Sequence, residues 1–472
     1  MNIKVKVILN NLSYTVLSNV ISLLISILVV LVVPKVIGVE AYGYWQLYMF
    51  YATYVGFFQF GWNDGIYLRY GGKEYNELNK SIFFSQFWML TISQLALASI
   101  IIFVTLNFIN EEEKIYILGM TALCMVIAGT RAMLLFILQG TNRIKEYAQI
   151  TMMDRIFYIC LIVIFLIIGI REYKLMILAD IIGKSVSLIY AMCCCKDIVF
   201  RKITTFYFSF KEAFENINVG IKLMFANIAS MLIIGVVRFG IEHSWDVATF
   251  GRVSLTLSIS NFLMLFINAV GIVMFPILRR TDEKKLPGIY CTMRDFLMIA
   301  LFGVLIVYYP FKEILSAWLP KYADSLAYMA ILFPMCIYEG KMSLLINTYL
   351  KTLRKEKMML KVNLVTLAFS IIITIITTIV FRNLDLAILS IVLFLAFRCI
   401  LAEIYLSRIL EISMAVDIVL ELIMVAIFIM SGWYVNSWMT VAIYMVAYII
   451  YLFIKRKDIS GTIKNIKTLT QT

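Results

Sequence analysis

The chain has 472 residues, of which 62% are hydrophobic and 15% are charged, and its formal net charge at pH 7 is +13. A soluble globular domain has about 45–50% apolar and about 25% charged residues, so this composition excludes a soluble fold. It also excludes a disordered chain and a disulfide scaffold, because apolar residues are abundant and the eight Cys are sparse. Long unbroken apolar runs favour an all-α polytopic membrane protein over a β-barrel, whose strands would alternate.

Apolar runs long enough to cross a membrane occur fourteen times. A helix needs about 20 apolar residues to cross the hydrocarbon core. The first run carries no charge, is predicted to end at Pro34, and is too long for a cleavable signal peptide, so we expect it to be retained. The predicted spans are residues 11–33, 42–67, 81–108, 115–140, 150–170, 175–195, 221–241, 247–278, 292–310, 325–350, 358–381, 386–407, 413–433 and 437–454.

Lys and Arg are concentrated in alternate connections between these spans. Basic residues crowd the N-terminus, the connection at 196–220 and the tail that begins at Lys455. Since short loops rich in Lys and Arg stay on the cytoplasmic side, both termini are predicted to be cytoplasmic. This topology and contact with anionic lipids explain the positive net charge, so we expect no nucleic-acid partner.

The connection at 196–220 divides the chain into two lobes. We predict an N-lobe at 1–195, a cytoplasmic amphipathic linker at 196–220, a C-lobe at 221–409, and two further helices with a basic tail at 410–472. Each lobe begins with a similar hairpin. The pair Tyr42-Gly43 recurs as Phe250-Gly251 at an offset of 208 residues, and Leu68-Arg69 recurs as Leu278-Arg279 at an offset of 210. Six helices per repeat would give the two lobes the same topology.

The first hairpin carries a family resemblance. Its sequence reads VIGVEAYGYWQLYMF at 36–50 and QFGWNDGIYLRY at 59–70. It resembles the first hairpin of the polysaccharide-export, or Wzx-like, branch of the multidrug/oligosaccharidyl-lipid/polysaccharide (MOP) superfamily. The run AVGIVMFPILRR at 269–280 is similar to the end of the eighth span in that branch. The layout of six plus six helices with two C-terminal helices extends the resemblance over the whole chain.

The resemblance implies a flippase. Such a protein moves undecaprenyl-pyrophosphate-linked oligosaccharide repeat units from the inner to the outer leaflet of the bacterial cytoplasmic membrane, as in O-antigen, capsule or teichuronic-type polymer assembly. It would work by alternating access through a cationic cavity. The implied partners are the lipid-linked oligosaccharide and membrane lipids. A coupling ion, H⁺ or Na⁺, and contacts with a polymerase or other polysaccharide-assembly proteins are compatible with it.

Ionisable side chains inside the predicted spans are the candidate substrate-binding residues. A charge at mid-membrane costs about 2.5–3.5 kcal/mol, so it normally faces a cavity or a partner. Arg131, Glu339, Lys341 and Arg398 are such residues, and the 208-residue offset places Arg131 level with Glu339. Gly340 permits a local break in its helix. The alternative for Arg131 and Arg398 is a structural ion pair with a carboxylate.

Arg238 and Arg252 lie on either side of the outer connection between the seventh and eighth spans. The resemblance places spans 1, 2, 7 and 8 around the central cavity. Because the guanidinium fork matches the oxygens of a pyrophosphate, we expect both residues to contact the head group in the outward-open state. The alternative is that they extend to the outer lipid head groups.

Asp64 and Arg69, at the cytoplasmic end of the second span, are predicted to form an inner gate with Arg279 or Arg280. For Asp64 the alternative is a solvated position at a helix end. Each of these residues lies near the point where a span meets the cytoplasm, and opposite charges there could close the path between two lobes.

Two further pairs of charged residues are four positions apart and therefore share a helix face. Asp180 and Lys184 have opposite charges and are predicted to pair with each other. Asp417 and Glu421 have like charges and lie near the predicted cytoplasmic surface. They fall outside the repeat, and we assign them no transport role.

Motifs of metal, cofactor or enzyme chemistry are not found. Cys193, Cys194 and Cys195 are consecutive and lack the spacing of a zinc site, and His243 is the only histidine. The sequence has no phosphate-binding loop and no dinucleotide fingerprint. No connection exceeds about 25 residues, which leaves no room for a soluble catalytic domain. We therefore expect no metal, no cofactor and no enzymatic activity.

Two alternative functions stay open. The first is an ion-coupled drug exporter of the multidrug and toxin extrusion (MATE) branch, which would favour acidic cavity residues. Here the corresponding spans carry Arg131, Arg238, Arg252 and Lys341 instead. The second is a membrane-embedded glycosyltransferase or polysaccharide polymerase, which would ordinarily carry a large outer loop with catalytic residues.

Overall fold

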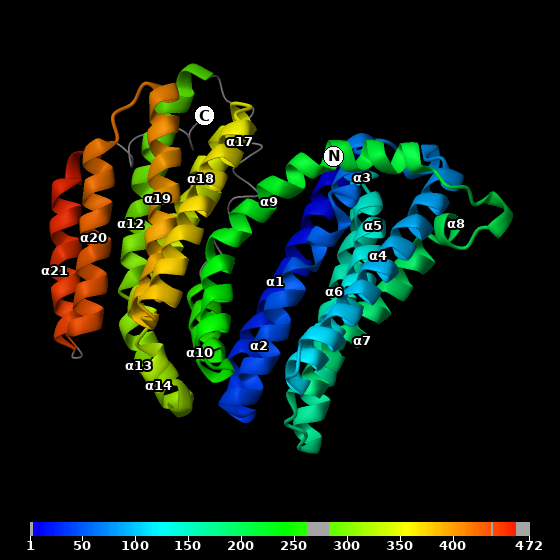
Figure 1. Ribbon diagram of the computed structural model, residues 1–472. Helices are drawn as coiled ribbons and strands as arrows, with labels where there is room; N and C mark the ends of the chain where they lie inside the picture. The colour runs from blue at the N-terminus through cyan, green and yellow to red at the C-terminus, as the bar shows by residue number, and fades with distance from the viewer. Residues whose placement is uncertain (1–2, 263, 265–282, 436–437, 459–472) are drawn as a thin grey trace. The chain divides into compact units, whose positions relative to one another are not determined.

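The computed structural model describes residues 3–262, 264, 283–435 and 438–458. Over these ranges the chain is built from helices and contains no β-strand (Figure 1). In the described part of the chain, eleven helices are long and apolar enough to cross a membrane, and α21 (Met439–Ile454) is a shorter apolar helix. The prediction of an all-α, multi-pass membrane protein is therefore confirmed.

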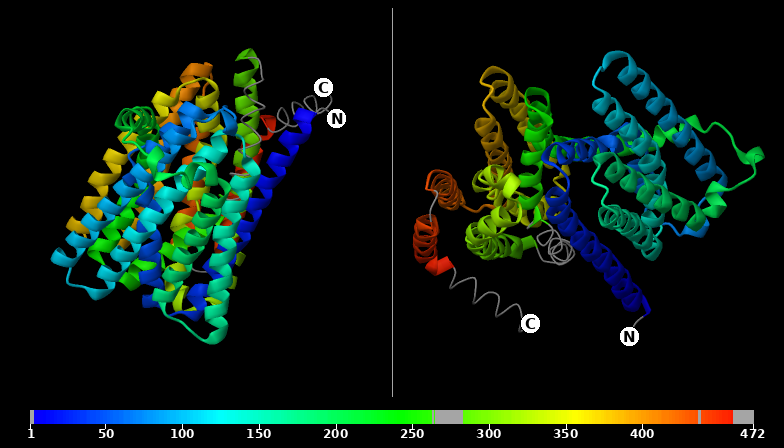
Figure 2. Two further views of the ribbon diagram at one scale, coloured as in Figure 1. Left: turned by 90° about the vertical axis from the view of Figure 1, so that its right-hand side faces the viewer. Right: turned by 90° about the horizontal axis from the view of Figure 1, so that it is seen from below.

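The chain divides into two compact units, Met1–Ile228 and Ala229–Thr472. Within each unit the long helices run roughly parallel or antiparallel to one another (Figure 2). The helices of the first unit are α1 (Ile3–Val36), α2 (Val39–Tyr54), α3 (Trp62–Tyr70), α4 (Lys80–Phe108), α5 (Glu112–Gly140), α6 (Ile144–Ile168), α7 (Tyr173–Cys194), α8 (Lys196–Val199) and the first part of α9 (Phe210–Ser244). Among them α6 packs on α7, α4 on α5, and α1 on α6.

The second unit contains the remainder of α9 and the helices that follow it. These are α10 (Val247–Ser260), α12 (Leu286–Leu305), α13 (Tyr308–Trp318), α14 (Ala323–Leu326), α15 (Met329–Leu332), α16 (Met335–Lys341), α17 (Asn347–Thr352), α18 (Glu356–Thr374), α19 (Leu384–Leu410), α20 (Ala415–Tyr434) and α21. Two π-helical segments, Met342–Ile346 and Ile375–Val380, widen the helices around them. Short 3₁₀ segments lie at Val55–Gln59, Tyr75–Glu77, Ile203–Thr205, Glu283–Lys285 and Pro320–Tyr322.

Several predicted boundaries differ from the observed ones. Helix α1 does not end at Pro34 but continues to Val36, because a proline in the last turn removes few hydrogen bonds. The predicted linker at 196–220 is helical from Phe210 onward, as the first part of α9. Its exposed apolar residues fit the expected place at the membrane interface: Phe200, Ile203, Tyr207, Phe208, Phe210 and Phe214. Of the predicted span 247–278, residues 263 and 265–278 lie outside the described residues.

The predicted span 42–67 is interrupted. Helix α2 passes into a 3₁₀ turn, and Phe60 and Gly61 then adopt left-handed backbone angles, with φ of 51° and 78°. Inside a membrane the backbone groups released by such a break need partners from neighbouring helices. Gln94 of α4 supplies one, because its side-chain amide donates to the carbonyl of Phe58 at 2.8 Å. The side-chain amide of Asn63 donates to the carbonyl of Gly129 at 3.2 Å.

Helices α3 and α9 approach each other closely just after this break. Gly61 and Gly65 are four residues apart on one side of the contact, and Asn216 and Gly220 are four apart on the other. A Cβ atom on Gly65 would lie 1.8 Å from the carbonyl oxygen of Asn216, and one on Gly220 would lie 2.0 Å from that of Gly61. This is the small-xxx-small spacing that lets two membrane helices cross at short distance.

The segment at 329–352 forms the centre of the second unit. It has the highest buried share among the eleven candidate spans, with 89% of its most apolar window buried. Its helix α15 is followed directly by α16, and the π-helical segment Met342–Ile346 joins α16 to α17. A charged side chain on this segment is therefore surrounded by protein, and it must find its partners there.

The α3–α9 crossing gives a direct test of the fold. We expect Gly65→Ala to lower the free energy of unfolding by about 1–3 kcal/mol, because the added methyl group must push two backbones apart. The matched control is Gly119→Ala on α5, where a Cβ atom meets no atom within 4 Å. That control should be neutral or stabilising, since Ala favours a helix over Gly. Thermal unfolding of both variants in detergent measures the difference, and equal melting temperatures would contradict the crossing.

Candidate functional site

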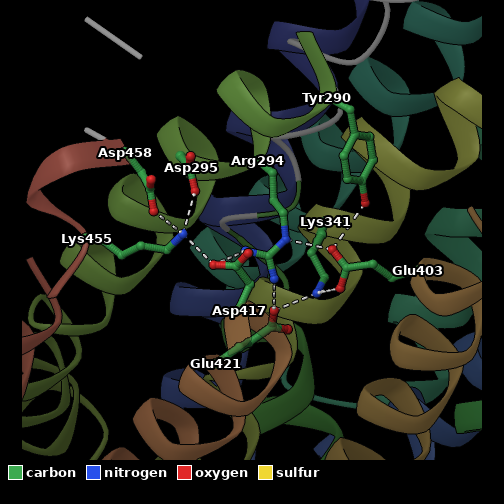
Figure 3. Close-up of polar contacts among 9 residues, drawn as sticks. All are labelled: Tyr290, Arg294, Asp295, Lys341, Glu403, Asp417, Glu421, Lys455 and Asp458. Carbon is green, nitrogen blue, oxygen red and sulfur yellow. Dashed lines mark hydrogen bonds and ion pairs between the residues drawn. The ribbon is translucent and has the colours of Figure 1, made fainter. Parts of the chain in front are cut away.

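Four ionisable side chains form a buried cluster in the second unit (Figure 3). They are Arg294 on α12, Lys341 on α16, Glu403 on α19 and Glu421 on α20, and each side chain is at most 2% exposed. Glu403 accepts hydrogen bonds from Arg294 Nε and from Lys341 Nζ, both at 2.7 Å. Glu421 Oε2 accepts from Lys341 Nζ at 2.5 Å and from Arg294 Nη2 at 3.2 Å. Two basic and two acidic side chains thus face each other at hydrogen-bond distance.

This cluster fixes four helices to one another. Moving an ion from water into a protein interior costs several kcal/mol of solvation free energy. Only close opposite charges and hydrogen bonds offset this cost. Glu403 has a third hydrogen-bond donor, because the hydroxyl of Tyr290 also donates to its Oε1 at 3.1 Å. Lys341 lies between the two carboxylates, and Arg294 spans the same two groups. A shift of any of the four helices would separate charges that cannot be solvated by lipid.

The cluster continues toward the end of α21. Arg294 Nη1 lies 3.7 Å from Asp417, which pairs with Lys455. Lys455 Nζ also lies 3.3 Å from Asp295 and 2.8 Å from Asp458. Burial alone would lower the pKa of Lys455, but its hydrogen bonds to Asp417 and Asp458 raise it above the usual value. The pair Asp417 and Glu421, to which the sequence assigned no role, therefore belongs to this network.

The predicted residues Glu339 and Arg398 are brought together beside the cluster. Arg398 Nη1 lies 3.1 Å from Glu339 Oε1, its Nε donates to Asn363 Oδ1 at 2.9 Å, and its Nη2 donates to Ser230 Oγ at 2.8 Å. The side chain of Arg398 is 5% exposed, whereas that of Glu339 is 23% exposed. The structural ion pair considered for Arg398 is thus present, and Glu339 is its more accessible member.

Glu339 and Lys341 face different surroundings although they are two positions apart. Lys341 is fully buried in the four-charge cluster, while Glu339 contacts Arg398. Gly340 itself is helical, and the irregular backbone begins one residue after Lys341, at the π-helical segment Met342–Ile346. Such π-bulges are frequent at functional sites in helices.

The first unit has its own buried ion pairs. Arg131 on α5 donates to Asp154 on α6 at 2.6 Å and to Ser187 on α7 at 3.1 Å. The predicted pair of Asp180 and Lys184 is present on α7. Asp180 also accepts a hydrogen bond of 2.6 Å from the hydroxyl of Tyr48 on α2. Arg131 thus has a carboxylate partner within its own unit.

Arg69, predicted as a gate residue, is held by α9. Its guanidinium lies 2.6 Å from Glu212 and 2.7 Å from Glu215, and it donates to Asn216 at 2.5 Å. Asp64 is partly buried on α3. Arg279, the third gate residue, lies outside the described residues, so the gate stays a prediction.

Arg238 and Arg252 lie on α9 and α10, near the connection between the two helices. Arg238 Nη2 donates to Ser254 Oγ at 3.0 Å, and its guanidinium carbon lies 5.2 Å from the centre of the Phe250 ring. Arg252 is exposed. Within the second unit these two residues do not join the clusters of Lys341 or Arg398.

A polar cluster on the predicted cytoplasmic side ties three connections of the first unit together. The ring of Tyr75 lies between Lys80 and Arg143, and its hydroxyl donates to Asp197 at 2.6 Å. Burial tends to raise the pKa of Asp197, but the bond from Tyr75 and the charge of Lys80 hold it below the usual value. Burial raises the pKa of Cys195 to about 12, so its thiol is unreactive. Among the residues that the structure describes, no His, Cys, Asp and Glu group could hold a metal ion.

Sequence reasoning missed Arg294, Glu403 and Asp154. Each lies inside a predicted span, but within ten residues of the predicted boundary, where a charge can be mistaken for a helix-end residue. The signal was available, because each is an ionisable residue in an otherwise apolar run. The six predicted cavity residues do not gather at one point within either unit.

Solved structures of other proteins share the architecture of this chain. No protein-family model and no curated protein matches the chain. One similar structure is the inward-facing conformation of a multidrug resistance MATE family transporter of the MOP superfamily, with a TM-score of 0.62 and 11% identity over 83% of this chain and 98% of that chain. The chain has the fold of MOP superfamily transporters. Another is the lipid II flippase MurJ in an inward closed conformation, with a TM-score of 0.60 and 14% identity over 96% of this chain and 100% of that chain.

The fold that the sequence resemblance implied is therefore present. One similar structure is named as a transporter and the other as a flippase. TM-scores of 0.62 and 0.60 establish the shared fold, and identities of 11% and 14% show nothing about the substrate.

The buried cluster gives a second test. We expect Glu403→Gln to lower the free energy of unfolding by about 3–5 kcal/mol, because a neutral amide replaces one of the two carboxylates that Arg294 and Lys341 share, and one of its two polar atoms is itself a donor. Adding Lys341→Met should recover part of the loss by removing one of the buried donors that faced this carboxylate. The control is Glu411→Gln, an exposed residue at the end of the same helix. Thermal unfolding in detergent checks the order, and a Glu403 variant as stable as the control would refute it.

Proposed function

We propose that the chain translocates undecaprenyl-pyrophosphate-linked oligosaccharide repeat units from the inner to the outer leaflet of the bacterial cytoplasmic membrane. The observation that carries this proposal is the shared fold with lipid II flippase MurJ over 96% of this chain and all of that chain. The name of that protein specifies a lipid substrate. The hairpin sequence at 36–70, which resembles the polysaccharide-export branch, supports an oligosaccharide on the lipid carrier.

The mechanism is alternating access between two units that each behave as a body. Buried ion pairs hold the helices of each unit together, as in the clusters of Lys341 and of Arg131. A ligand can shift the equilibrium between inward and outward states only by its different affinity for the two. Cationic side chains that contact the pyrophosphate in one state would provide that difference.

Arg238 and Arg252 are the strongest candidates for this contact. Arg131, Lys341 and Arg398 already have carboxylate partners within their own units, which reduces what they can offer to an anion. Arg252 is exposed, and Arg238 is partly exposed near the same helix ends, where it donates to Ser254 and lies against the Phe250 ring. A guanidinium that solvent can reach presents its donor fork to phosphate oxygens. In this proposal Glu339 and Arg398 shape the cavity, and Asp64, Arg69 and Arg279 form the inner gate.

A second candidate function is ion-coupled drug export. It is favoured by the similarity to the MATE family transporter, whose TM-score of 0.62 is close to that of the flippase. The two functions differ in the charge of their cargo, because a drug exporter of this kind would carry cations. An assay that offers both kinds of cargo to the same preparation therefore separates them.

Translocation can be measured with purified protein in liposomes. We expect a fluorescently labelled undecaprenyl-pyrophosphate oligosaccharide in the inner leaflet to become accessible to a membrane-impermeant quencher only when the protein is present. Protein-free liposomes and liposomes with an unrelated membrane protein are the controls. Efflux of a cationic dye driven by H⁺ or Na⁺, without movement of the labelled lipid, would refute the flippase and support the exporter.

The arginine pair gives a residue-level test in the same assay. We expect Arg252→Ala and Arg238→Ala each to slow translocation about tenfold or more, since a hydrogen bond to a charged group contributes about 1.5–3 kcal/mol. Arg252→Lys keeps the charge but not the fork and should be intermediate. The control is Arg171→Ala, an exposed arginine at another predicted outer connection. Equal rates for all variants at equal protein levels would show that these arginines do not bind the substrate.

A further inference from the structure

Glu421 has one carboxylate oxygen without a donor inside the cluster of Figure 3. Its Oε2 accepts from Lys341 and Arg294, and the dashed lines in Figure 3 reach only that oxygen. The described part of the chain offers no hydrogen-bond donor to Oε1, although the side chain is only 2% exposed. Leaving a buried charged oxygen without a partner is costly, so the group is expected to bind something that neutralises it.

The charges around Glu421 also indicate that it binds a positively charged group. Among the described residues, the buried cations of this network are Arg294, Lys341 and Lys455, and four carboxylates lie among them, those of Asp295, Glu403, Asp417 and Glu421. The carboxylate of Asp458, which is 53% exposed, is left to solvent. Three positive and four negative charges leave an excess of one negative charge. A monovalent cation would remove it.

The geometry favours a proton over a metal ion. In the described ranges no group of three or more His, Cys, Asp or Glu side chains is arranged to hold a metal. Both oxygens of Glu403 are already bound by Arg294, Lys341 and Tyr290. Asp295 and Asp417 pair with Lys455. Of the two fully buried carboxylates, Glu403 and Glu421, only Glu421 thus has an oxygen to which no donor of the described residues is directed.

We propose that Glu421 carries an exchangeable proton that keeps this cluster neutral and regulates how firmly α20 and α21 are held. With the proton bound, the network joins α20 to α12, α16 and α19 without net charge. Its release leaves one uncompensated negative charge next to three helices, which weakens the attachment of α20. The inference concerns proton binding by the chain itself and does not rest on the proposed function.

The titratable and charged groups around Glu421 come from each helix packed against it. Helix α15 supplies none. The others are Tyr290, Cys291, Arg294 and Asp295 on α12, Tyr338 and Lys341 on α16, Cys399 and Glu403 on α19, Asp417 on α20, Tyr444, Tyr448 and Tyr451 on α21, and Lys455 and Asp458 after it. Glu403 has its full set of partners, and the tyrosines and cysteines titrate only in alkaline solution when buried. Glu421 is thus the buried acid of this network that has room for a proton.

The test uses the purified full chain without substrate. We expect infrared spectra at neutral pH to show the carbonyl absorption of a protonated carboxyl group, which disappears as the pH rises. It should be missing in Glu421→Gln, which keeps the shape of the side chain, and should remain in Asp458→Asn, the matched control from the exposed end of the network. If the band is absent from the wild-type protein, or is unchanged in Glu421→Gln, the proposal is overturned.

Stability gives an independent measurement. While the folded chain holds this proton and the unfolded chain has lost it, the unfolding equilibrium constant should rise by up to about tenfold per pH unit, and the rise should end where the folded chain loses the proton. Glu421→Gln should lose this dependence and Asp458→Asn should keep it. Hydrogen exchange of α20 and α21, after correction for the intrinsic pH dependence of amide exchange, should increase at high pH in the wild-type protein and in Asp458→Asn but not in Glu421→Gln. If Glu421→Gln does not fold, the wild-type infrared band and its pH dependence still decide the question.

Discussion

A charge surrounded by lipid must find its partner inside the protein, and this constraint organises both units. Lipid chains are as apolar as leucine, so burial of apolar surface does little to hold membrane helices to one another. In the second unit, Arg294, Lys341, Glu403 and Glu421 bind four helices through short contacts. In the first unit, Arg131 performs the same role for three helices. Arg131, Lys341 and Arg398, which the sequence offers as substrate-binding residues, thus each have a carboxylate partner within their own unit.

The helices themselves were predictable because the apolar runs that form them are long. The interruption at Phe60 and Gly61 was not, since the average polarity of the run 42–67 is too low to show a break. Its signals were local. They are the polar residues that follow it, such as Asn63, and the glycine spacing of Gly61 and Gly65, whose meaning depends on the partner helix α9. A sequence read one helix at a time cannot supply that partner.

The candidate site was predictable in part, for a similar reason. Arg131, Lys341 and Arg398 were found as intramembrane charges, but their partners come from other helices far along the chain. Arg294 was missed because α12 begins at Leu286, six residues before the predicted start, which places the arginine deeper than expected. Glu421 was predicted to lie near the cytoplasmic surface together with Asp417. Only the fold shows that α20 turns this carboxylate toward Lys341 and Arg294.

The π-helical segment at Met342–Ile346 has a consequence for comparison with relatives. A π-bulge holds one residue more than the α-helical turn that it replaces, which makes it equivalent to a single-residue insertion. Every side chain beyond it is rotated by about 100° about the helix axis relative to an uninterrupted helix. Lys341 before it and Tyr349 after it are both fully buried, so the packing depends on this phase. An alignment with a relative that lacks the bulge must therefore open a one-residue gap within a helix.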